Sequence, residues 1–169
     1  MLTNNDTGIN RIVAENEWLK LNRYQFVPTR IFRLSGIYSP ERNIFLRLTN
    51  GQVRYVKKNN HFFSRTHVAD IAQVLFKSLS HSKSGEIYNV ADNMPCSYDE
   101  TISYACSLMG IQTPSPMLFK SLNEGEMKSF YKDSKKVSNA KIKKNLKVKL
   151  YFPTYKEGFK SILNNIFNR

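Results

Sequence analysis

Glycine is scarce and scattered in this chain of 169 residues, with seven glycines at positions 8, 36, 51, 85, 110, 125 and 158. Loops that cradle a phosphate, such as G-x-G-x-x-G or G-x-x-x-x-G-K-[ST], need clustered glycines, because backbone amides must approach the phosphate at a helix N-terminus. No two of these glycines are close enough to build either motif. The sequence therefore contains no recognisable site for the pyrophosphate of a dinucleotide or for a nucleoside triphosphate.

Cysteine is also scarce, and the two residues present, Cys96 and Cys106, are compatible with a reducing compartment. Cys106 falls on one face of an expected helix together with Ile102 and Met109. A thiol at such a position behaves as a small buried hydrophobic group. We therefore expect Cys106 to be structural rather than reactive.

Metal ligands and long apolar runs are lacking as well. His61 and His67 do not complete a set of ligands at metal-binding spacing, so we predict no metal site. No apolar run approaches the roughly 18 residues that a membrane span needs. The segment from Met1 to Asn10 is polar and carries no targeting signal. We expect a cytoplasmic protein.

Positive charge dominates, with 26 Lys and Arg against 13 Asp and Glu and a net charge of +13. The densest run lies within residues 127–149 and contains the lysines 128, 132, 135, 136, 141, 143, 144, 147 and 149, with Asp133 as the sole counter-charge inside the run. Phe130 and Tyr131 are too few to form a stacking platform for bases. We therefore favour a solvated surface over a nucleic-acid groove, and the second reading stays open.

Short β-like runs alternate with helical ones, which predicts an α/β protein. Helices are expected over about residues 9–21 and 43–49, and strands over about 27–34, 53–56 and 87–90. Ser97 with Glu100 and Thr154 with Glu157 each have the spacing of a capping box, and Gly110 is a typical helix stop. Three later helices are marked by apolar stripes, at positions 68, 71, 72, 75 and 79, at 102, 105, 106 and 109, and at 155, 159, 162, 163, 166 and 167.

Four stretches, in this order, resemble the C-terminal half of extended short-chain dehydrogenases/reductases, the NAD-dependent epimerase/dehydratase family. They are residues 7–15 (TGINRIVAE), 32–40 (FRLSGIYSP), 63–72 (FSRTHVADIA) and 85–90 (GEIYNV). They are similar to the family's Y-G-x-S-K-x-x-A-E, R-x-x-x-x-Y-G-P, H-V-x-D-[IV]-A and G-x-x-Y-N-[VI]. The tail from SNAK at 138 to PTYKEG ending at 158 also looks like the family's closing helices.

The resemblance implies the C-terminal part of a Rossmann-like doubly wound sheet plus a small α/β substrate-binding subdomain. It places residues 1–60 in the remnant of the sheet and residues 61–169 in the substrate-binding part. The strand through Ile31 to Leu34 would then lack a neighbour that the family supplies from its N-terminal half. We expect an open strand edge, uncovered apolar faces and poor stability without a partner.

The family's catalytic pair is replaced. Where the resemblance implies a proton-exchanging Tyr and, four residues later, a Lys, this sequence has Thr7 and Arg11. A Thr hydroxyl cannot exchange a proton near neutral pH as a phenol assisted by a cation can. Arg11 can still donate to ribose hydroxyls, so we assign it to cofactor binding and assign no catalytic residue.

The loop that the family places beside the nicotinamide corresponds here to Ser35, Ile37 and Tyr38, which we take as candidate cofactor-binding residues. For Tyr38 a packed loop aromatic is the equal alternative. The family's glycines after this tyrosine are replaced by Ser39 and Glu41. Substrate binding is assigned to Arg42 and to Arg65, which has the strand parity of a phosphate-binding Arg that many members carry two residues earlier.

These features predict a truncated or split protein of this type that binds no cofactor and is inactive alone. A separately encoded N-terminal half would restore an NAD or NADP site. The alternative is a non-catalytic module in which Arg11, Arg42 and Arg65 hold an anionic small molecule such as a nucleotide sugar.

Overall fold

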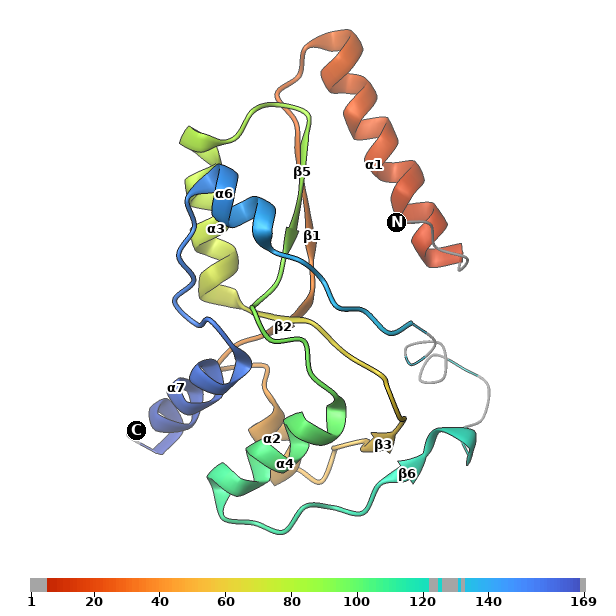
Figure 1. Ribbon diagram of the computed structural model, residues 1–169, viewed down its shortest axis with the longest axis vertical. Helices are drawn as coiled ribbons and strands as arrows, with labels where there is room; N and C mark the ends of the chain where they lie inside the picture. Colours follow the sequence, from red (N-terminus) through yellow and green to blue (C-terminus); the bar gives the residue numbers. More distant parts are fainter. Residues whose placement is uncertain (1–5, 122–124, 126–130, 132, 168–169) are drawn as a thin grey trace.

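The computed structural model describes residues 6–121, 125, 131 and 133–167, with the backbone alone at 7, 120, 166 and 167. Helices and short strands alternate along it, as expected for an α/β protein (Figure 1). The elements are α1 (Asp6–Gln25), β1 (Arg30–Leu34), β2 (Gly36–Tyr38), α2 (Ile44–Thr49), β3 (Val56–Lys57), β4 (Arg65–His67), α3 (Val68–His81), β5 (Glu86–Val90), α4 (Tyr98–Met109), β6 (Met117–Leu118), the 3-10 turn η1 (Phe119–Ser121), α6 (Ala140–Leu146) and α7 (Tyr155–Phe167).

All three strand pairs are parallel: β1 with β5, β2 with β4, and β3 with β6. The longest pair runs in register from Arg30 opposite Glu86 to Leu34 opposite Val90. The pairs β1–β5 and β2–β4 each join residues on both sides of position 60. Among the described residues β1 pairs with β5 alone, so its other edge is open.

The β1–β5 pair has a helix layer on each side (Figure 1). On one side Phe32 stacks on Tyr88, with ring centroids 5.7 Å apart, against a buried cluster contributed by α3, β5 and α6. On the other side Glu15 of α1 forms a two-oxygen ion pair with Arg33 of β1. Parallel strands are normally covered on both faces, so this arrangement is a narrow piece of an α/β sandwich.

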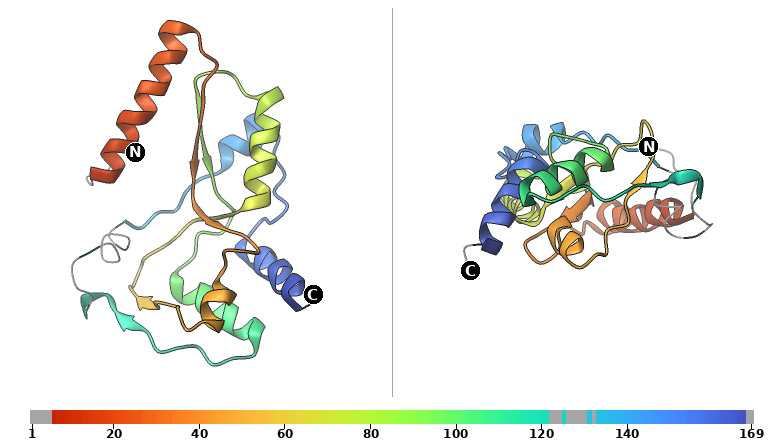
Figure 2. Two further views of the ribbon diagram at one scale, coloured as in Figure 1. Left: turned by 180° about the vertical axis from the view of Figure 1, so that it is seen from behind. Right: turned by 90° about the horizontal axis from the view of Figure 1, so that it is seen from below.

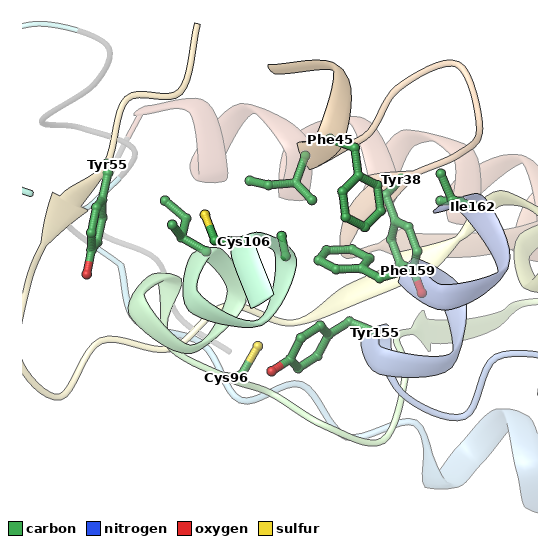
Figure 3. Close-up of a cluster of buried hydrophobic side chains, with 11 residues drawn as sticks. Tyr38, Phe45, Tyr55, Cys96, Cys106, Tyr155, Phe159 and Ile162 are labelled. Carbon is green, nitrogen blue, oxygen red and sulfur yellow. The ribbon is translucent and has the colours of Figure 1, made fainter. Parts of the chain in front are cut away.

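A second core lies where α2, α4 and α7 meet (Figure 3). The capping box of Ser97 and Glu100 starts α4, and Gly110 ends it in the left-handed conformation, both as predicted. Cys106 is buried in this core, which confirms its structural assignment. The second predicted capping box, at the start of α7, forms in part. The Glu157 carboxylate accepts from the Thr154 amide, but the Thr154 hydroxyl accepts from the amide of Lys156 rather than from that of Glu157.

A buried carboxylate ties the two cores together. Asp70, in the first turn of α3, accepts hydrogen bonds from the amides of Tyr151 (2.6 Å) and Phe152 (3.2 Å). These residues lead directly into α7, so Asp70 fixes the path between the β1–β5 layer and the second core. Its role in the described chain is structural, in addition to any interaction with the helix dipole.

The apolar stripe predicted for α3 is largely uncovered. Ile71 is buried, but Val68, Ala72, Leu75 and Leu79 are exposed. The face that packs against β5 and α6 instead carries Asp70, Ile71, Val74 and Ser78. Helix α3 therefore has two apolar faces, and the described chain covers one of them.

The lysine-rich segment is partly neutralised. Lys128, Phe130 and Lys132 lie outside the described residues, and Tyr131 is buried. Lys135 pairs with Asp133, and Lys141 pairs with Glu86 at 2.5 Å. Asp133 is thus not the sole counter-charge, because β5 supplies a second one.

Candidate functional site

The candidate site is the region where the parallel strands end. Ligands of open α/β sheets bind outside the carboxyl ends of the strands. Here β1 ends at Leu34 and β5 ends at Val90. After β1 the chain turns at once into β2. Ser35 closes this end of the pair, since both its amide (3.0 Å) and its hydroxyl (2.9 Å) donate to the carbonyl of Val90.

The predicted cofactor-facing residues Ile37 and Tyr38 point to different environments, because neighbouring strand residues alternate. Ile37 is 43% exposed, so its side chain is free to contact a ligand or another polypeptide. Tyr38 is buried, with its ring edge-on to that of Phe159 at 5.5 Å (Figure 3). On another side the ring of His67 lies edge-on to it at 5.1 Å. Tyr38 therefore has the packing role that was its alternative.

Burial also determines the chemistry of Tyr38. It raises the pKa of the phenol far above its usual range, and the carboxylates of Asp92 and Asp70 raise it further. The hydroxyl has no hydrogen-bond partner among the described residues. A phenol in this setting stays neutral and does not exchange protons near neutral pH.

Arg65 turns toward the second core. It begins β4 opposite Gly36, and its guanidinium donates to the sulfur of Cys96 at 3.0 Å. The same group lies 5.8 Å from the ring of Phe63 and 5.9 Å from that of Tyr155. The register thus brings Arg65 next to the strand that carries Ile37 and Tyr38, but its charge is engaged inside the chain.

Arg11 and Arg42 are exposed, and neither belongs to β2 or β4. Arg11 lies on α1, one turn after Thr7, whose side chain is outside the described set. Arg42 lies in the turn after β2, where its amide donates to the carbonyl of Ser39 at 3.2 Å. Neither guanidinium forms a hydrogen bond or ion pair with the described residues, so both remain available to an external anion.

Asp92, just after β5, is a buried acid that the sequence analysis did not select. Its carboxylate accepts from the Met94 amide at 3.0 Å, and its own amide donates to the Arg65 carbonyl at 2.7 Å. Burial raises the pKa of Asp92 to about 6, while the Met94 amide and the charge of Arg65 lower it. The sequence signal that could have identified Asp92 is its position directly after the strand β5.

The described residues contain neither a cluster of metal ligands nor a glycine-rich phosphate loop. They contain no group of three or more His, Cys, Asp or Glu side chains able to hold a metal ion. Their left-handed glycines Gly51, Gly85 and Gly110 lie in separate turns rather than in one strand-to-helix loop. None of these turns joins a strand to a helix in the way that a loop holding a dinucleotide pyrophosphate does. No helix in the described ranges is long and apolar enough to cross a membrane.

No protein-family model matches the chain, and no curated protein matches it either. Solved structures do. A functionally unknown conserved protein from Silicibacter pomeroyi is 36% identical, with a TM-score of 0.90 over 98% of this chain and 58% of its own. The dTDP-glucose 4,6-dehydratase of Bacillus anthracis in complex with NAD is 16% identical, with a TM-score of 0.79 over 100% of this chain and 54% of its own.

The enzyme WbmF of Bordetella bronchiseptica, in complex with NAD+ and UDP, is 18% identical, with a TM-score of 0.71 over 99% of this chain and 55% of its own. The chain thus spans little more than half the length of these structures. Its fold matches the C-terminal half of Rossmann-like epimerase and dehydratase folds.

Proposed function

We propose that this chain is the substrate-side, C-terminal half of an atypical NAD(P)-dependent epimerase/dehydratase-like protein, and that it is not catalytic alone. The observation that carries the proposal is the asymmetric match: the whole of this chain aligns with about half of a NAD-bound dehydratase. The part that binds a dinucleotide pyrophosphate in such folds is a glycine-bearing turn between a strand and a helix. The described residues offer none.

The sequence has Thr7 and Arg11 where the family has its catalytic Tyr and Lys, which supports the proposal that the chain is not catalytic alone. Thr7 and Arg11 stand on the first two turns of α1, four residues apart and on one side of the helix. A hydroxyl of ordinary acidity cannot serve as the acid or base there. The phenol of Tyr38 does not replace it, since its pKa is raised by burial and its ring is packed against Phe159.

If an N-terminal half completes the site, we assign the cofactor-facing contacts to Ser35, Ile37 and Arg11. Tyr38 would then hold residues 35–38 in place through its packing in the second core. The completed site would take NAD or NADP, which supplies hydride transfer. The role of this chain is to shape the nicotinamide side of the pocket through the end of β1. Ile37 provides the exposed apolar surface, and Arg11 provides a permanent positive charge.

The test is a co-expression experiment. The chain is produced with the part of the Silicibacter pomeroyi protein that it does not match, and NAD and NADPH binding to the purified pair is measured by calorimetry. Saturable binding by the pair is expected, weakened by Ile37→Asp but not by Leu118→Asp, a change at an exposed residue on β6. A stable pair that takes up neither cofactor would refute the proposal.

A non-catalytic binding module for an anionic small molecule, such as a nucleotide sugar, is the second candidate. The net charge of +13 favours it, as do the guanidinium groups of Arg11 and Arg42, which form no ion pair with the described part of the chain. Arg65 argues against a simple three-arginine site, because it would have to leave Cys96. Thermal shifts with a panel of nucleotide sugars would detect binding, and Arg42→Gln should abolish it while Arg54→Gln, at another exposed position, should not.

A further inference from the structure

We propose that the open edge of β1 and the exposed apolar stripe of α3 form one docking surface, which receives a parallel α/β polypeptide. The occupant adds a strand parallel to β1 and lays an apolar helix against α3. This inference rests on the proposed function, because the occupant is the companion half. We call the surface, made of β1 and the α3 residues Val68, Ala72, Leu75 and Leu79, the open face.

The hydrogen-bonding groups of the β1 edge can be assigned from the two ends of the strand. The carbonyl of Thr29 accepts from Gly85 at 2.7 Å, and the amide of Ser35 donates to Val90 at 3.0 Å. Main-chain groups alternate between the two edges of a strand, so the odd-numbered residues point to β5. The amides and carbonyls of the even-numbered residues, Arg30, Phe32 and Leu34, therefore point to the open edge.

The α3 stripe has the composition of a helix face that packs against another protein layer. Leu75 is 44% exposed and Leu79 is 74% exposed, and they lie one helical turn apart. Ala72 and Val68 continue the row toward the start of the helix and are also exposed. Contiguous apolar surface of this kind on a soluble protein marks an interaction site.

The strand edge and the helix stripe belong to the same side of the molecule. In Figure 2, left, β1 lies nearest the viewer between α1 and α3, with β5 and α6 behind them. Helix α6 packs against the far flank of α3 and against β5. The flank of α3 left free is thus the one next to the open edge of β1. One incoming βα layer can cover both.

A companion half fits this face better than a second copy. Two copies would bring together two chains that each carry a net charge of +13. A parallel sheet grows by adding strands in the same direction with helices on both faces, and β1 already has α1 and α3 in those positions. The similar structures also carry about as much chain again as this one.

The experiment uses the full 169-residue chain and the unmatched part of the Silicibacter pomeroyi protein as the probe, with complex formation measured by gel filtration and affinity capture. Leu79→Asp should weaken the complex by about tenfold or more, because it places a charge in a desolvated contact. Leu118→Asp is the matched control, since Leu118 is 63% exposed on β6, away from this face, and should have no effect.

A second pair of variants tests the strand edge. Leu34→Pro removes an amide that faces the open edge, whereas Leu34→Ala keeps it, so only the proline should cause a large loss of binding. Hydrogen exchange at Arg30, Phe32 and Leu34 should slow by about tenfold or more in the complex. Circular dichroism of each free variant establishes that it is folded.

The outcomes separate this inference from the proposed function. A complex that depends on Leu79 and on the Leu34 amide but binds no NAD or NADP supports the open face and refutes the function. A cofactor-binding complex that is indifferent to all these changes overturns the open face alone. The absence of a complex, or self-association through these residues, overturns the open face as well.

Discussion

The phenol oxygen of Tyr38 lies directly against Gly158, so the side chain of Tyr38, from β2, packs against the backbone of α7. A Cβ placed on Gly158 would stand 2.1 Å from that oxygen and 2.7 Å from the ring carbon Cε2. The contact places residues 35–38, which include the candidate cofactor-binding residues, against the last helix. It explains why a glycine is accepted in the first turn of α7, although glycine is a poor helix former.

Gly158→Ala should destabilise the chain by about 1–3 kcal/mol through overpacking, although alanine is the better helix former by about 1 kcal/mol. Urea unfolding measures the change. Tyr38→Phe alone should be close to neutral, because it removes a buried hydroxyl that has no partner in the described chain. In the Gly158→Ala background it should recover part of the loss. A Gly158→Ala variant as stable as the parent would contradict the close contact.

Asp70→Ala should cost about 2–3 kcal/mol, since it leaves the amides of Tyr151 and Phe152 without their acceptor. Asp70→Asn keeps one acceptor oxygen and should cost less. The comparison is made by urea unfolding at neutral pH. Equal stability of the alanine and asparagine variants would show that the two hydrogen bonds do not secure the segment leading to α7.

Asp92 should make stability fall as the pH rises. Its pKa is raised from 3.8 to about 6 by burial, so the folded chain holds a proton that the unfolded chain has already lost between these values. Its contribution to the unfolding free energy therefore decreases across that window, by up to about 3 kcal/mol.

Asp92→Asn removes this titration. Relative to the parent, the variant should gain stability between about pH 4 and pH 7, as followed by urea unfolding at several pH values. The comparison cancels the other acids, including Asp70, whose pKa burial also raises. Parallel pH profiles for parent and variant would show that Asp92 titrates normally.

Both cysteines should be unreactive in the folded chain. Cys96 and Cys106 are each 1% exposed, and burial raises the pKa of both thiols. The thiolate is the reactive form, so an aromatic disulfide reagent should react with neither residue in native buffer and with both in denaturant. Rapid reaction of one thiol under native conditions would contradict the packing of the second core.

Helices and caps could be predicted because their signals are local. The capping box at Ser97 and the stop at Gly110 are set by residues within one turn, and the structure confirms both. The pair β2–β4 could not be predicted in the same way. Each strand has three residues, too few to show a period, and their pairing joins positions about thirty apart.

The covered face of α3 could not be predicted either. Periodicity identifies an apolar stripe, but it does not identify the layer that will cover it. Leu75 and Leu79 belong to the predicted stripe and are exposed, whereas Asp70 and Ser78 are buried by neighbours that only the fold reveals. The same holds for Tyr38, whose place in the core depends on Gly158, 120 positions later in the chain.

The most direct test of the central claim is a titration of the purified 169-residue chain with NADH and NADPH, followed by cofactor fluorescence and by calorimetry. With no glycine-bearing turn in the described residues to hold a pyrophosphate, the chain should show no saturable binding and no turnover of any nucleotide sugar. Tight one-to-one uptake of either cofactor by the chain alone, with turnover, would contradict the account.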